Sequence, residues 1–187
     1  MKAVFIHGKQ YKKELLLSHK EVEKLQSFLQ SSTHNDVLIL NTNLGVEIYY
    51  SCSLDCSSII VNSFLMFFSK TNKCKEDFKI VSINSNEDLV NRATYIFKKL
   101  VTMPMIFTSY SKSTYNQLTH LCVNNTKLVN QLLVLWQEVL FLEAQNEEPS
   151  LKSRKFLENI QNVYVDNYCK KPMQELIKIA MCKLRYN

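Results

Sequence analysis

Glycine is the residue that this sequence most conspicuously lacks. It occupies 2 of the 187 positions, about 1% where roughly 7% is usual. A phosphate-binding loop or a dinucleotide-binding fingerprint needs several glycines close together, because the backbone must approach the phosphates closely. Gly8 and Gly45 stand far apart. The sequence therefore argues against P-loop NTPases and Rossmann-type dinucleotide enzymes.

Long apolar runs are also lacking. The longest candidate, residues 59–68, is interrupted by Asn62 and Ser63 and falls short of the roughly 18 residues that a membrane-spanning helix needs. Residues 1–6 carry one lysine and too short an apolar run for a signal peptide. We therefore expect an intracellular protein with no membrane association, whose six cysteines are free and largely buried thiols. Nucleus and cytoplasm are not distinguished.

Arginine is scarce among the basic residues, although the net charge is +6. Residues 150–187 hold eight basic and three acidic side chains, 8 − 3 = +5 of that total. Bidentate recognition of phosphates and bases favours arginine over lysine, so a solvated lysine surface is the simpler interpretation. Contact with nucleic acid is the alternative. Its candidate residues are Lys170, Lys171, Lys178, Lys183 and Arg185.

The clearest local pattern is a strand that leads into an amphipathic helix. Residues 78–83 are mostly apolar and β-branched, which predicts a buried strand. Ser85 and Asp88 have the spacing of a helix-capping pair. The apolar residues that follow share one helical face: Leu89, Ala93, Ile96, Phe97 and Leu100.

Similar patterns predict the remaining elements. They are strands at 3–6, 37–40 and 46–50, a hairpin loop at 41–45, and helices at 12–30, 56–70, 113–122, 127–145, 151–168 and 172–184. Leu15 is expected on the inner face of the first helix, and Asp55 is expected to cap the second. Residues 103–107 are expected to form a short strand or an extended linker, because Pro104 disfavours a helix there. The last helix is expected to pack through Met173, Leu176, Ile177, Ala180 and Leu184.

Together these elements predict an α/β (α+β) fold. It consists of a small mixed β-sheet of four or five strands with flanking helices, followed by a helical C-terminal part. We expect an α/β domain at 1–110 and a helical region at 111–187 packed on it, with a further boundary at 146–150, where Asn-Glu-Glu-Pro interrupts the helical pattern.

Residues with reactive side chains do not form a recognisable motif. The four histidines show no metal-ligand spacing, and no second cysteine pair completes a zinc site with Cys52 and Cys56. Cys56 comes nearest to an activated thiol at a helix start, but a small apolar packing role is more common. Tyr49 and Tyr50 are candidates for stacking on nucleic-acid bases, but strand alternation puts only one on each face. We expect no catalytic residue, no metal and no cofactor.

Asp36 and Glu47 flank the two hairpin strands, where metal-dependent nucleases built on a sheet often hold acids. With the order of elements through residue 100, this layout broadly resembles the nuclease-like domains of the XPF type. Some of those domains have lost catalysis and serve as dimer partners. The Glu-Arg-Lys catalytic core of that family and the glycines of its tandem helix-hairpin-helix region are absent here. The resemblance therefore implies an inactive, nuclease-like partner subunit.

The predicted helices at 56–70 and 127–145 carry more apolar side chains than one inward face requires. They are either buried centrally in the chain or form a partner interface, where aromatic residues and methionine are enriched. We expect a non-enzymatic subunit of a hetero-oligomer that acts as a protein–protein interaction or scaffold module; a nucleic-acid-binding or DNA-processing factor is the alternative. The residues expected at the partner interface are Phe64, Phe67, Phe68, Trp136 and Phe141.

Overall fold

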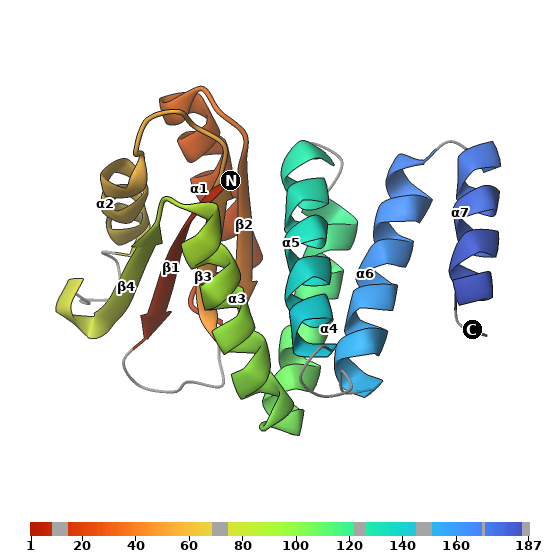
Figure 1. Ribbon diagram of the computed structural model, residues 1–187. Helices are drawn as coiled ribbons and strands as arrows, with labels where there is room; N and C mark the ends of the chain where they lie inside the picture. The colour runs from red at the N-terminus through yellow and green to blue at the C-terminus, as the bar shows by residue number, and fades with distance from the viewer. Residues whose placement is uncertain (9–14, 69–74, 122–125, 145–150, 170, 185–187) are drawn as a thin grey trace.

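A computed structural model shows a four-stranded antiparallel sheet between two layers of helices (Figure 1). It describes residues 1–8, 15–68, 75–121, 126–144, 151–169 and 171–184. The strands are β1 (Lys2–Gly8), β2 (Val37–Thr42), β3 (Gly45–Tyr50) and β4 (Phe78–Ile83). The helices are α1 (His19–Thr33), α2 (Ser57–Phe68), the short η2 (Lys75–Asp77), α3 (Asn86–Val101), α4 (Pro104–Leu121), α5 (Thr126–Ala144), α6 (Leu151–Tyr168) and α7 (Lys171–Leu184).

The strands are ordered β2-β3-β1-β4, and every neighbouring pair is antiparallel. The sequence-based prediction of a small sheet with flanking helices and a helical C-terminal part is confirmed. It left room for parallel neighbours, and none occurs among the described strands. The β2–β3 hairpin reverses the chain and brings β3 alongside β1 in the opposite direction. β4 then pairs with the other side of β1.

The hairpin depends on Gly45, the first residue of β3. Its φ is +133°, a conformation that L side chains rarely adopt. A Cβ at this position would lie 2.2 Å from the backbone oxygen of Ile6 on β1. Glycine is therefore required both for the backbone angle and for the close approach of β3 to β1.

One face of the sheet is covered by α1 and α2, whose side chains pack on Val4, Ile6 and Ile48. α1 begins at His19, seven residues later than the sequence predicted, and Leu15 is 48% exposed instead of lying on an inner face. The later start follows from a capping box. The Ser18 hydroxyl accepts from the Glu21 N–H, and the Glu21 carboxylate accepts from the Ser18 N–H at 2.7 Å.

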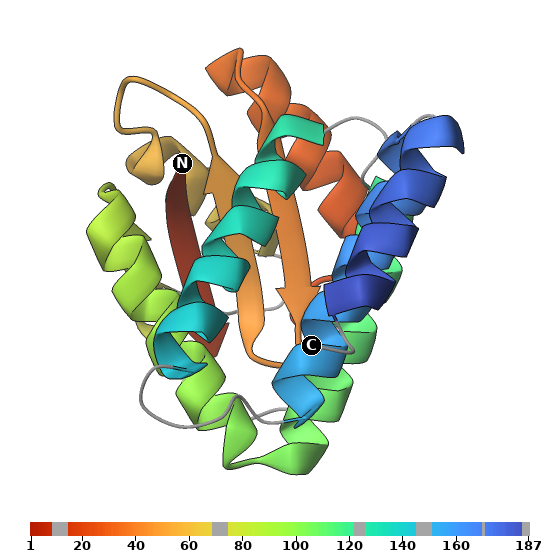
Figure 2. The same ribbon diagram turned by 45° about the vertical axis from the view of Figure 1, so that its right-hand side comes forward.

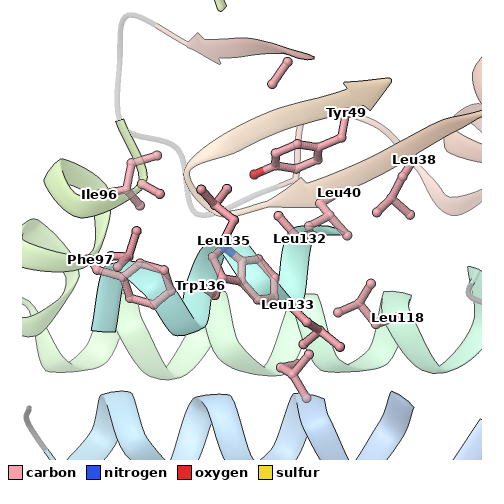
Figure 3. Packing of buried hydrophobic residues seen from close by; sticks show 14 of the residues in the cluster. Leu38, Leu40, Tyr49, Ile96, Phe97, Leu118, Leu132, Leu133, Leu135 and Trp136 are labelled. Atoms are coloured by element: carbon pink, nitrogen blue, oxygen red, sulfur yellow. The ribbon is translucent and has the colours of Figure 1, made fainter. Parts of the chain in front are cut away.

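The other face is covered by α3, α4 and α5, with α6 packed against α4 and α5 (Figure 2). Figure 3 shows Leu40 and Tyr49 of the sheet meeting Leu132 and Trp136 of α5 in this layer. Strand alternation explains how one chain supplies two cores. Odd-numbered residues of β1 such as Phe5 face α3 to α6, and even-numbered residues face α1 and α2.

The predicted helix after β4 is confirmed as α3. Ser85 is its N-cap and accepts from the Asp88 N–H at 3.1 Å. The five residues expected on its inner face are all buried. The prediction for residues 103–107 is wrong, because α4 begins at Pro104. Proline suits the first turn of a helix, where its missing N–H would have no intrahelical acceptor, so it opens α4 nine residues before the predicted start.

The exposed edge of β2 is closed by a side chain of α4. The Gln117 amide accepts from the Asn41 N–H through Oε1 and donates to the Asn41 oxygen through Nε2, both at 2.7 Å. Gln117 thereby takes the place of a fifth strand at this residue, which reduces the tendency of an open sheet edge to pair with other chains.

α7 is the outermost helix and packs chiefly against α6 (Figure 1). The division of the chain at residue 110 stays a prediction; α4 runs through that residue, and its Phe107 and Tyr110 lie in the same core as Phe97 of α3. Within the described residues, no helix combines the length and apolar character required to cross a bilayer.

Candidate functional site

The main candidate site is a basic pocket at the end of the sheet where β1 stops. The C-terminal end of β1, the β2–β3 turn, the start of β4 and one side of α3 enclose a volume of about 240 Å³. We call it the basic pocket. Its polar and charged side chains are His7, Thr42, Asn43, Lys79, Arg92, Tyr95 and Lys99.

Arg92 occupies the centre of this arrangement. Its guanidinium lies 5.4 Å from the centre of the Phe5 ring and 5.6 Å from that of Tyr95, which are cation–π distances. Nη2 lies 2.8 Å from Nε2 of His7. No ion pair joins Arg92 to a carboxylate among the described residues, and its Nε is buried without a hydrogen-bond acceptor. Aromatic rings and a neutral acceptor, rather than an anion, hold this cation in place.

The contacts of His7 define its tautomer. Nδ1 lies 2.5 Å from the Leu44 carbonyl oxygen, which can only accept, so Nδ1 carries the proton. Nε2 then presents its lone pair to the Arg92 guanidinium, which can only donate. Burial lowers the pKa of His7, and the charges of Arg92, Lys79 and Lys99 lower it further, against the opposing effect of the Leu44 hydrogen bond. His7 is neutral at pH 7 and acts as a spacer that orients Arg92.

The pocket is strongly cationic. Lys79 and Lys99 are exposed at its wall, and none of the described residues that line it is acidic. The charge of Arg92 lowers the pKa of the buried Glu47, but burial raises that pKa more strongly. Glu47 does not line the pocket. An anion is the ligand that this charge distribution favours.

Helical spacing explains how α3 supplies three of these side chains. Arg92, Tyr95 and Lys99 are separated by 3 and 4 residues and share one side of the helix. Lys98, the neighbour of Lys99, does not line the pocket. The sequence pattern could have suggested this cationic helix face. It contained no signal for His7, which joins Arg92 across 85 positions of chain.

The second candidate site is the carboxyl group of Glu47, which is fully enclosed. It is 1% exposed and lies on the face of β3 that meets α3 to α6. The Tyr49 hydroxyl donates to its Oε2 at 2.7 Å, and Oε1 has no partner. Burial raises its pKa to about 7, against the lowering effects of Tyr49, Tyr110 and Arg92. The adjacent cavity measures about 10 Å³, which is too small for a substrate.

No protein family, curated protein or solved structure shows significant similarity to this chain. The resemblance to XPF-type nuclease-like domains therefore stays a prediction. The structure does not bring its two acids together at a site: Asp36 is exposed before β2, whereas Glu47 is buried in the helical core.

The residues predicted at a partner interface are mostly part of the protein's own core. Phe64, Phe68 and Trp136 are buried, so that part of the prediction is corrected. Phe67 is half-buried against the core between the sheet and α1–α2, and the side chain of Phe141 lies outside the described residues. The surplus of apolar side chains arises because each face of the sheet has a separate core. The prediction assumed that each helix buries only one apolar face.

The predicted basic residues are only partly described. Lys171 and Lys178 are exposed on α7, and Lys178 Nζ forms an ion pair with Asp166 of α6 at 2.7 Å. Lys170, Arg185 and the side chain of Lys183 lie outside the described residues. No cluster of basic side chains is therefore assembled on the described part of α7.

The candidate thiol, Cys56, and the two candidate stacking residues, Tyr49 and Tyr50, are all buried. Cys52, Cys56 and Cys169 are free thiols. Burial raises the pKa of Cys56, which makes its thiol less nucleophilic. Tyr49 and Tyr50 are both buried, one in each core, so neither can stack on a base. Within the described residues, no group of three or more potential ligands is placed to hold a metal ion.

The remaining surface feature is the outer face of α7. Met173, Leu176 and Ile179 are 54%, 64% and 54% exposed, and their spacing places them within about a third of the helix circumference. The sequence predicted that Met173 and Leu176 would pack inward, and that prediction is wrong. Ile177 is half-buried, while the side chains of Ala180 and Leu184 lie outside the described residues.

Proposed function

We propose that this protein is a non-enzymatic intracellular subunit of a protein complex and that it docks on its partner through the outer face of α7. The observation that carries the proposal is the exposure of Met173, Leu176 and Ile179 on one side of a helix that packs chiefly against α6. Exposed apolar side chains on one helical face are typical of helix-in-groove recognition.

Charge favours a different protein over a second copy of this chain. Residues 150–187 carry a net +5 by sequence, and Lys171 and Lys178 are exposed on α7. Two copies packed through the apolar face of α7 would bring two basic segments together, whereas an acidic protein would complement them. The partner that fits is therefore an acidic protein with an apolar groove.

The environments of three reactive groups support a non-enzymatic role. Glu47 is enclosed next to a cavity too small for a substrate. Cys56 has a raised pKa, and both ring nitrogens of His7 are engaged in hydrogen bonds. None of the three is free to act on a bound molecule in this arrangement.

The proposal is tested by tagging the full chain and purifying it from its native cell in three forms: wild type, Leu176→Asp and Met105→Asp. Met105 is 87% exposed on α4 and supplies a matched control. We expect an acidic partner that co-purifies with the wild type and with Met105→Asp and whose yield falls at least tenfold with Leu176→Asp, the effect of losing one central apolar contact. Equal recovery in all three forms would contradict the proposal, as would self-association of the purified chain through α7.

The alternative is a nucleic-acid-binding or DNA-processing factor that uses the basic C-terminal helices. Exposed Lys171 supports it, and the Lys178–Asp166 ion pair weakens it because that cation already has a counterion. A duplex bound through phosphate contacts would lose affinity steeply with added salt. Steep salt dependence that is reduced by Lys171→Ala would favour this alternative over docking through an apolar face.

A further inference from the structure

We propose that the basic pocket binds the phosphoryl group of a small phosphate monoester, with Arg92 as its main ligand and Lys79 and Lys99 as supporting cations. This inference is independent of the docking role of α7, because the pocket is built from β1, β4, α3 and the β2–β3 turn.

The first argument is the state of Arg92. An arginine has five N–H donors, and the described residues supply one acceptor for them, Nε2 of His7. The charge is half-buried and has no carboxylate counterion among the described residues. Burying a charged group without a partner is unfavourable, so a guanidinium held in this way gains most from an anion that arrives from outside.

The second argument is preorganisation. Rings on two different elements, Phe5 of β1 and Tyr95 of α3, contact the guanidinium. His7 fixes one nitrogen of it and is itself anchored to the Leu44 carbonyl. The conformational freedom that a surface arginine loses on binding is thereby already lost, which is the condition under which a charge-assisted hydrogen bond contributes fully to affinity.

The third argument selects the anion. Three cationic side chains line the pocket, and a carboxylate carries one negative charge with two oxygens. A phosphate monoester carries up to two charges and three terminal oxygens near pH 7, which matches this donor set better. The scarcity of glycine argues against a glycine-rich phosphate loop, and the basic pocket offers side-chain donors instead.

Size and surroundings indicate a small ester and not a polymer. A volume of about 240 Å³ accommodates a phosphoryl group with a modest organic substituent. Tyr95 is 57% exposed at the wall of the pocket and offers an aromatic surface to that substituent. Among the described residues, Arg92 is the one arginine that lines the pocket, whereas tracking a nucleic-acid backbone requires a longer row of cations.

The test is a titration of the isotope-labelled full chain, followed by amide NMR, with phenyl phosphate and with benzoate as the carboxylate counterpart. We expect saturable shifts at His7, in the 42–45 turn and along the 92–99 side of α3. The dissociation constant for phenyl phosphate should rise at least tenfold in Arg92→Gln and several-fold in Lys99→Ala. Lys98→Ala removes the same charge from the adjacent exposed residue and should leave it unchanged.

Several results would overturn the proposal. They are the absence of saturable shifts, equal affinity for benzoate, and equal effects of Lys98→Ala and Lys99→Ala. A single-stranded oligonucleotide that binds the pocket more tightly than phenyl phosphate would also overturn it, in favour of a nucleic-acid end as ligand. Lys99 is exposed, so Lys99→Ala keeps the test decisive if Arg92→Gln fails to fold.

Discussion

Replacing Glu47 with glutamine should remove a pH dependence that the fold itself creates. Glu47 is buried among aromatic side chains, and burial raises its pKa from 4.5 to about 7. The folded chain therefore holds a proton that the unfolded chain has already released between these two values. Because the unfolded state binds fewer protons in that range, the stability of the wild type falls as the pH rises.

The magnitude follows from the two pKa values. A carboxyl whose pKa rises from 4.5 to about 7 on folding destabilises the folded state by about 3 kcal/mol once it is fully ionised. Most of this loss lies between pH 5 and pH 8, where we expect about 2.5 kcal/mol. Glutamine preserves the shape of the side chain and its acceptor for the Tyr49 hydroxyl, but it does not ionise.

The assay is urea unfolding of the wild type and Glu47→Gln at several values of pH from 5 to 8. From pH 5 to pH 8, the free energy of unfolding of the wild type should fall by about 2.5 kcal/mol relative to that of Glu47→Gln. The lowered pKa of His7 acts in the same way on both proteins and cancels in the difference. Glu138→Gln, at an exposed position of α5, should run parallel to the wild type. Parallel curves for Glu47→Gln as well would refute the reasoning.

Three further substitutions test the fold around the sheet. Gly45→Ala should lower the free energy of unfolding by at least ~2 kcal/mol, because its Cβ would meet the Ile6 oxygen; an unchanged urea midpoint would show that the hairpin adapts. Gln117→Leu should cost about 1–3 kcal/mol and speed hydrogen exchange at the Asn41 amide, which loses its acceptor; unaltered exchange would contradict this. Ser18→Ala should cost about 1 kcal/mol through loss of the N-cap, and no change in thermal melting would argue against that cap.

Elements that are specified locally could be predicted from the sequence. The strand β3 and the apolar face of α3 are both present as predicted, and Ser85 caps its helix because its hydroxyl accepts from a backbone N–H three residues away. The start of α1 could also be predicted from the sequence, because Ser18 and Glu21 have capping-box spacing. Pro104 alone does not locate the start of α4, because proline both interrupts helices and suits their first turn.

Features that depend on tertiary contacts could not be predicted. The burial of Glu47 depends on which face of β3 the helices α3 to α6 cover. The basic pocket depends on the pairing of β1 with both β3 and β4, which brings His7 to Arg92. The exposure of Leu176 could not be predicted either. An apolar stripe predicts that a helix face is buried, but it does not specify whether the same chain or another protein covers that face.

The central claim is that the outer face of α7 is covered by another protein while the rest of the chain folds by itself. Hydrogen–deuterium exchange of the chain alone and in the assembly isolated from its native cell tests this directly. We expect amide exchange in α7 to slow at least tenfold in the assembly, with the protection of β1 and β3 unchanged. Equal exchange of α7 in both samples would contradict the claim.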